Sequence, residues 1–273
     1  MNSLRLAVAL MLLSLPVLGL GQTASPEVLK AHALDSRALG RSVAYSLFVP
    51  PGVAPSGGWP LVVILHGDGR NHRSLADDAR AKALIARQPF AVLCPNGDRA
   101  WWIDSPLVAG SHYQSMLREL LDAVPRQFPV SAAPAKTVIA GWSMGGFGAV
   151  RFAQDHRERI GGLAIAMALV DFPNPALPKE QNYGVPAVMA DPARYAEFNC
   201  LTKAERLRGL PILQLAPVEA FDFTMNRNFH ARLTELGIAH DYREIPGGHV
   251  WSTVSDALPA LLEFAQKQFQ PAR

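Results

Sequence analysis

A short glycine-rich stretch, residues 141–146 (GWSMGG), places one hydroxyl between small residues directly after the apolar run 137–140. A Gly-x-Ser-x-Gly pattern between a buried strand and a helix permits a turn so tight that the flanking residues must be small. There Ser143 presents its hydroxyl at the end of the sheet, and the following helix directs N–H groups toward negative charge. The pattern indicates a nucleophile at Ser143; the alternative is a turn that only packs.

The second stretch that could do chemistry is HGDG, residues 66–69, directly after the apolar run 61–65. Small residues at a strand end expose backbone N–H groups, and with the N–H of Met144 they could form an oxyanion hole. The second donor is the amide of Asp68 or of Gly67, and we take Asp68 as the working assignment.

A general base is the third requirement, and His249 is the best candidate among eight histidines. It lies in a glycine turn, residues 246–251 (PGGHVW), after a predicted last strand at 240–245. We predict that His66, at a strand end, is a packed structural histidine rather than a base. His66 and His72 lack further ligands at a recognisable spacing, so we expect no metal.

The elements that must position these residues alternate between strands and helices, which predicts a mostly parallel sheet covered on both faces. Continuous apolar runs are typical of parallel strands buried on both faces. Those runs are 61–65, 90–94, 137–140, 163–166 and 211–215, preceded by a short strand at 43–49. Apolar residues at helical spacing occupy 116–124 and 254–265, and a further helix is predicted at 226–236.

Two other segments organise the chain. Residues 22–41 lack a strong period and are interpreted as a lead-in. Residues 171–208 contain five prolines that break any long helix, so we expect a short cap-like insertion over the carboxyl ends of the strands. No linker is long enough for a second domain, and 22–273 is predicted to be one domain.

The first 21 residues have the layout of a secretory signal peptide. One positive charge, at Arg5, precedes the apolar run 6–20, and small residues stand before Gln22. A membrane anchor is the alternative, but the run is shorter than a span requires and contains Pro16. We therefore expect export to the periplasm or the medium, without a stable membrane anchor.

Export would place Cys94 and Cys200 in an oxidising compartment, where they either pair as a disulfide or remain partly buried free thiols. The chain is 49% hydrophobic and 18% charged, with a formal net charge of +3, which suits a full apolar core. Lys and Arg form no block, so we expect no nucleic-acid partner.

These motifs together resemble the esterase D-like family of α/β-hydrolases, which includes S-formylglutathione hydrolases, feruloyl esterases and mycolyltransferases. The resemblance spans about residues 43–264 and rests on five motifs: ILHGDG, WWIDSP, GWSMGGFGA, NRNF and PGGHVW. It implies the α/β-hydrolase fold, Ser143 as nucleophile, His249 as base, and an aspartate on the loop after the penultimate strand.

The sequence departs from the family at that aspartate. The loop 217–223 is PVEAFDF, and counting without gaps puts Ala220 where the acid belongs. Three alternatives stay open: Asp222 takes the role in a reshaped loop, Glu219 reaches in with its longer side chain, or no acid is present. We favour Asp222, because Asp-Phe shortly before Asn226 resembles the family's pattern.

Trp101 and Trp102 follow the strand that ends at Cys94 and so lie at the ligand end of the sheet. They either line a pocket for an acyl or aromatic leaving group or pack as large apolar rings at its rim.

The sequence as a whole predicts an exported serine hydrolase that cleaves small-molecule carboxylic esters through an acyl-enzyme on Ser143, with His249 as base and without a cofactor. The alternative is a weakly active or inactive binding protein on the same scaffold, because Ala220 stands at the expected acid position.

Overall fold

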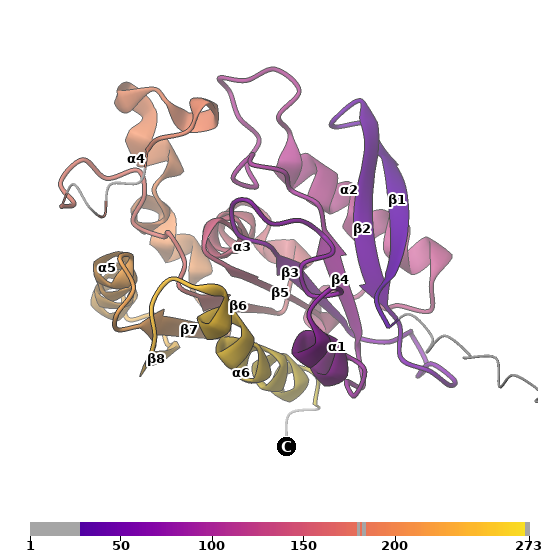
Figure 1. The fold of residues 1–273 in the computed structure, drawn as a ribbon. Helices are drawn as coiled ribbons and strands as arrows, with labels where there is room; N and C mark the ends of the chain where they lie inside the picture. Colours follow the sequence, from indigo (N-terminus) through magenta and orange to yellow (C-terminus); the bar gives the residue numbers. More distant parts are fainter. Residues whose placement is uncertain (1–27, 179–180, 182–183, 271–273) are drawn as a thin grey trace, which may run out of the picture.

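The computed structural model describes residues 28–178, 181 and 184–270 (Figure 1). The predicted signal peptide, residues 1–21, lies outside this part of the chain. Among the described residues, no helix is long and apolar enough to cross a membrane.

One sheet of eight strands organises the described part of the chain, in the order β1-β2-β4-β3-β5-β6-β7-β8. From β4 to β8 neighbouring strands are parallel, whereas β1 and β2 run antiparallel to their neighbours at one edge. The strands are β1 (Lys30–Ser36), β2 (Arg41–Phe48), β3 (Leu61–Leu65), β4 (Ala91–Pro95), β5 (Thr137–Trp142), β6 (Gly162–Ala166), β7 (Ile212–Pro217) and β8 (Asp241–Ile245). The predicted strands are confirmed, with ends that shift by a residue or two.

Helices cover both faces of the sheet, as predicted, and each face has its own apolar core (Figure 1). Alternate residues of β3 point to opposite faces: Val63 packs in the core with α2, α3 and α5, and Val62 in the core with α1 and α6. The helices are α1 (Ala79–Ile85), α2 (Tyr113–Gln127), α3 (Met144–Asp155), α4 (Tyr195–Phe198), α5 (Phe223–Glu235) and α6 (Trp251–Phe269).

The strand β1 corrects the interpretation of residues 22–41 as a lead-in. Residues 30–36 pair antiparallel with β2 along their whole length. Most of their side chains are at least partly exposed, since β1 is an edge strand, so the alternation of apolar and polar residues that marks a half-buried strand is weak.

The proline-rich segment 171–208 contains only short helices among its described residues, the longest being the 3₁₀ helix η6 (Cys200–Leu207). This helix packs against α3 and α5. A role of the segment as a cap over the site stays a prediction.

The two cysteines are buried free thiols. Cys94 belongs to the core on one face of the sheet and Cys200 to the core on the other, so the sheet separates them. Burial raises the pKa of each thiol to about 12. Of the two alternatives for this pair, the free thiols are the correct one.

Candidate active site

The turn between β5 and α3 holds Ser143 in a backbone conformation that side-chain-bearing residues rarely adopt, with φ +55° and ψ −126°. Close packing imposes this turn. A Cβ atom on Gly145 would lie 2.0 Å from the carbonyl oxygen of Leu65, and one on Gly141 would lie 2.3 Å from the carbonyl oxygen of Gly145. The small residues of GWSMGG are therefore required by the turn, and Ser143 presents its hydroxyl as the sequence predicted.

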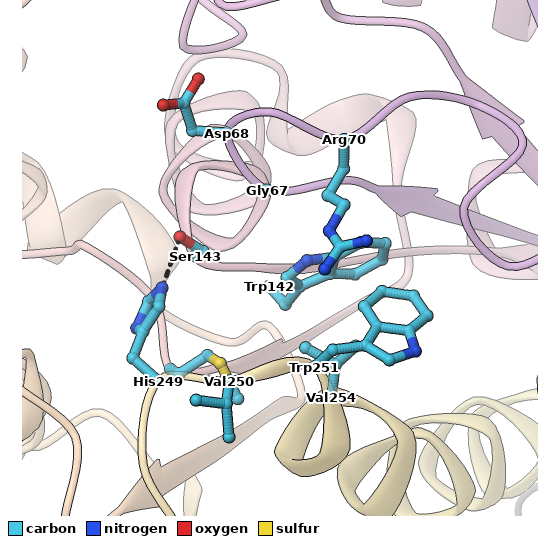
Figure 2. Close-up of a pocket in the computed structure, with 10 residues that line it drawn as sticks. Gly67, Asp68, Arg70, Trp142, Ser143, His249, Val250, Trp251 and Val254 are labelled. Atoms are coloured by element: carbon cyan, nitrogen blue, oxygen red, sulfur yellow. Dashed lines mark hydrogen bonds between the residues drawn. The ribbon is translucent and has the colours of Figure 1, made fainter.

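A chain of hydrogen bonds joins Ser143 to two residues far away in the sequence. The Ser143 Oγ lies 2.8 Å from His249 Nε2 (Figure 2). His249 Nδ1 in turn lies 2.7 Å from Asp222 Oδ1. The Asp222 side chain is fully buried, whereas that of His249 is 20% exposed. Nucleophile, base and acid candidates thus stand in hydrogen-bonding order.

The carboxylate that contacts His249 is that of Asp222. Its second oxygen accepts a 2.8 Å hydrogen bond from Asn226 Nδ2. The chain turns after β7, with the Phe223 N–H donating to the Ala220 carbonyl, and this turn directs Asp222 inward. Glu219 has an exposed side chain and contributes its backbone N–H to the Gly247 carbonyl. Of the open alternatives, the geometry favours Asp222.

The candidate oxyanion donors lie beside Ser143. Met144 is the first residue of α3, so its N–H has no intrahelical acceptor. Gly67 and Asp68 line the same cavity as Ser143, and a Cβ atom on Gly67 would approach the Ser143 Cβ to 3.0 Å. The Asp68 carboxylate is turned away from Ser143 (Figure 2). It receives two hydrogen bonds from Arg99, at 2.7 and 2.6 Å.

His66 is packed beneath this loop. Its Nδ1 lies 2.8 Å from the Gly67 carbonyl oxygen, and its Nε2 accepts a 2.9 Å hydrogen bond from the Gly97 N–H. Burial lowers the pKa of His66 to about 4, so the ring is neutral at neutral pH. Its Nδ1 and Nε2 are thus both engaged in holding the backbone, in agreement with a structural role.

Of the two alternatives for Trp101 and Trp102, lining the pocket at Ser143 is wrong, because both are buried core residues. Trp102 donates a 3.1 Å hydrogen bond to the His66 carbonyl and packs against Gly97 and Gly148. Trp101 stacks on Phe172 with ring centres 4.8 Å apart. Both have positive φ and are buried, and neither lines the cavity at Ser143.

The cavity beside Ser143 has another wall that sequence reasoning missed (Figure 2). Three of its residues carry large or charged side chains: Trp142, Trp251 and Arg70. A local signal existed, because Trp142 directly precedes Ser143 and Trp251 is two residues after His249. The other residues that line the cavity are Gly67, Asp68, Ser143, Met167, His249, Val250 and Val254.

A metal site is not part of this arrangement. Among residues 28–178, 181 and 184–270, no group of three or more His, Cys, Asp or Glu side chains could hold a metal ion.

Comparison with known proteins adds the family. The family model named Esterase matches residues 36–189. An esterase of Mycobacterium tuberculosis is 25% identical over 253 residues, covering 81% of this chain and 55% of that protein. The chain thus spans about half the length of that curated relative. An acetyl esterase of Caldicellulosiruptor saccharolyticus is 25% identical over 218 residues, covering 75% of this chain and 82% of that protein.

Solved structures with the same fold include esterases and hydrolases. A ferulic acid esterase superimposes with a TM-score of 0.75 at 21% identity, covering 88% of this chain and 98% of its own. An S-formylglutathione hydrolase of Staphylococcus aureus has a TM-score of 0.73 at 17% identity, covering 87% and 98%. The likeness shows that this chain has the α/β-hydrolase fold.

Proposed function

This chain belongs to the esterase family, and on that premise we propose that it hydrolyses carboxylic esters through a covalent acyl-enzyme on Ser143. The observation that carries the proposal is the hydrogen-bonded series from Ser143 through His249 to Asp222. Such a series lets a hydroxyl lose its proton as it attacks a carbonyl carbon.

In the first half of the reaction, His249 Nε2 takes the Ser143 proton while Oγ bonds to the ester carbonyl carbon. Asp222 accepts the Nδ1–H bond, which fixes the tautomer with a free lone pair on Nε2 and stabilises the imidazolium. The tetrahedral intermediate then collapses, and His249 passes its proton to the departing alcohol.

In the second half, water attacks the acyl-enzyme with His249 as base, releasing the acid and restoring Ser143. The amides of Met144 and Asp68 would hold the oxyanion that forms in each half. The proposal needs no cofactor or metal, and its substrate is a small-molecule ester. The alternative of an inactive binding protein rested on Ala220, and the Asp222–His249 contact weighs against it.

Labelling with a fluorophosphonate probe at neutral pH tests the nucleophile, because the probe reacts with an activated serine. We expect label on the wild-type protein, none on Ser143→Ala, and unchanged label on Ser56→Ala, which removes an exposed hydroxyl elsewhere. A folded wild-type protein that takes no label, or label that persists in Ser143→Ala, would contradict the proposal.

We also propose that residues 1–21 are a cleaved signal peptide and that the protein is exported to the periplasm or beyond. The full-length protein should be expressed in a host that exports proteins, and the exported product sequenced from its N-terminus. We expect its first residue to be Gln22.

A further inference from the structure

The cavity beside Ser143 contains a charged side chain that the proposed chemistry does not use. Arg70 follows the HGDG loop, and its guanidinium carbon lies 4.6 Å from the ring centre of Trp251 (Figure 2). The ring face attracts the cation, and a guanidinium that stacks in this way keeps its N–H edge open to a ligand.

The aromatic platform under Arg70 is held in place. Trp251 Nε1 donates a 3.0 Å hydrogen bond to Asp78, whose other carboxylate oxygen accepts the Ala81 N–H at the start of α1. Trp142 meets Trp251 edge to face, with ring centres 5.8 Å apart. The wall of the cavity is therefore built before any ligand arrives, which lowers the entropic cost of binding.

The negative charges near this wall already have partners. Asp68 binds Arg99, and Asp78 binds Trp251. In the described part of the chain, Arg70 itself belongs to no ion pair and no side-chain hydrogen bond. Among the described residues, no carboxylate forms an ion pair with the Arg70 guanidinium, so its positive charge is available to a ligand.

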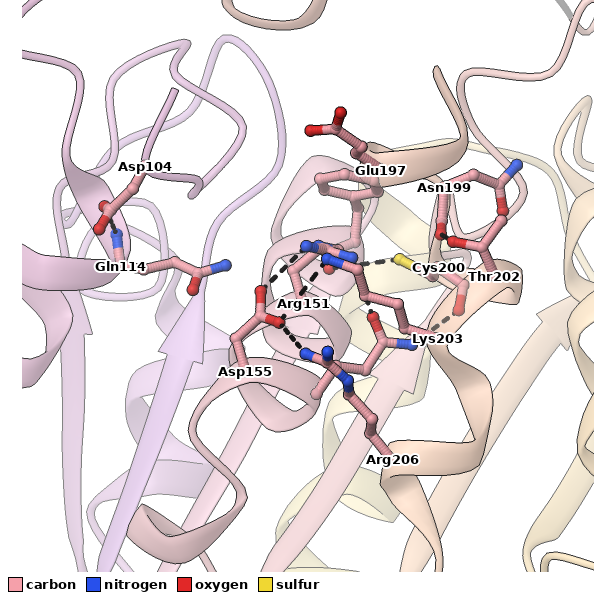
Figure 3. Close-up of polar contacts among 12 residues, drawn as sticks. Asp104, Gln114, Arg151, Asp155, Glu197, Asn199, Cys200, Thr202, Lys203 and Arg206 are labelled. Atoms are coloured by element: carbon pink, nitrogen blue, oxygen red, sulfur yellow. Dashed lines mark hydrogen bonds and ion pairs between the residues drawn. The ribbon is translucent and has the colours of Figure 1, made fainter. Parts of the chain in front are cut away.

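Elsewhere in the structure, a cluster of positively charged side chains is paired with a carboxylate of the protein (Figure 3). Arg151 and Arg206 each contact Asp155 at 2.9 Å, and Lys203 approaches it to 4.0 Å. These cations share a partly buried carboxylate and join α3 to η6, so their charges serve the packing of the protein. Arg70 differs because, among the described residues, its guanidinium contacts an aromatic ring and no carboxylate.

We propose that this hydrolase prefers esters that carry a carboxylate, and that Arg70 binds this group as the specificity-determining residue. The inference rests on the proposed function of Ser143. A planar guanidinium edge pairs with a carboxylate through two parallel N–H···O bonds, while Trp142 and Trp251 accommodate the apolar part of the same ester. The carboxylate belongs either to the acyl half or to the alcohol half of the ester.

Two matched pairs of esters test the proposal and distinguish those halves. For the alcohol half, 4-acetoxybenzoate is compared with the neutral 4-acetoxybenzamide; for the acyl half, mono-4-nitrophenyl adipate is compared with its methyl ester. We expect wild-type kcat/KM to be roughly tenfold higher for the anionic member of one pair. A charge-assisted hydrogen bond at a partly solvent-exposed site contributes a binding free energy that corresponds to about this ratio.

Three variants accompany the assay. Arg70→Gln should bring that ratio to about one, and Arg70→Lys should keep part of it, because the charge remains without the planar fork. Arg87→Gln removes another exposed positive charge outside the cavity and should leave the ratio unchanged. Raising the salt concentration should lower the wild-type ratio by screening.

A wild-type ratio near one in both pairs, or a ratio that survives in Arg70→Gln, would overturn the inference while hydrolysis of neutral esters left the proposed function standing. Wild-type protein that cleaves neither member of any pair would overturn both.

Discussion

The active site is built from two halves that obey different packing rules. The sheet-centre half comprises the HGDG loop, residues 66–69, and the turn at Ser143, carried by the central strands β3 and β5. The edge half comprises Asp222 and His249, on the loops after β7 and β8 at one edge of the sheet. Every side chain of β3 and β5 is buried, whereas none of those on β8 is.

Packing explains why the sheet-centre half retains the glycine pattern expected for the family, whereas the edge half departs from the family at the position of the acid. A Cβ atom on Gly145 would collide with the Leu65 backbone at 2.0 Å, while one on Gly248 would meet its nearest neighbour, the Glu219 carbonyl oxygen, at 3.6 Å. The edge half needs only a carboxylate within reach of His249. Any loop that delivers one is sufficient, and here the carboxylate that contacts His249 is that of Asp222, two residues after Ala220.

The largest expected effect lies in the edge half. Replacing Asp222 by Asn preserves its volume but removes the charge that orients His249, and we expect kcat to fall by about 10⁴-fold. Glu219→Gln, a neutralised carboxylate three residues earlier in the same loop, should change kcat less than twofold. Steady-state kinetics on a 4-nitrophenyl ester compares the two; a large loss in Glu219→Gln with a small one in Asp222→Asn would reverse the assignment.

The second prediction compares the loss of stability when one glycine of each half is replaced by alanine. Gly145→Ala forces the backbone of β3 and α3 apart, and we expect it to lower the free energy of unfolding by about 3 kcal/mol or more. Gly248→Ala makes an ordinary contact and should change stability by less than about 0.5 kcal/mol. Denaturant unfolding measures both. Equal losses in the two variants would remove the packing distinction between the halves.

The third prediction concerns the histidine beneath the sheet-centre half. Because burial lowers the pKa of His66 to about 4, the unfolded chain takes up a proton below about pH 6.5 that the folded chain refuses. The stabilising contribution is complete above pH 6.5 and is lost as the pH falls toward 4. Between pH 7 and pH 5 this histidine alone should cost about 2 kcal/mol of unfolding free energy.

Denaturant unfolding of His66→Gln at the two pH values isolates that contribution. The variant should lose about 2 kcal/mol less than the wild-type protein over this interval. His112→Gln changes an exposed histidine and should follow the wild-type pH dependence. A His66→Gln protein with the wild-type dependence would show that His66 is not the group responsible.

Much of the fold could be predicted because its signals are local. The central strands are continuous apolar runs, since both faces of a parallel strand are buried, and β3 begins and ends where its run does. The edge strand β1 escaped prediction because its partial exposure leaves little hydrophobic pattern to detect. For Trp101 and Trp102 two alternatives stayed open, because whether a ring after a strand end faces a pocket or the core depends on packing; both are core residues.

The sequence by itself determined the central strands of the sheet, the candidate nucleophile Ser143 and the candidate base His249. Each of these depends on a short local pattern in the sequence: an apolar run, a tight glycine turn, or a turn after a strand. Only the tertiary structure decided that Asp222 meets His249, that Arg70 and Trp251 form a wall beside Ser143, and that the sheet separates Cys94 from Cys200. These outcomes depend on distances between segments far apart along the chain, which packing sets and local pattern does not encode.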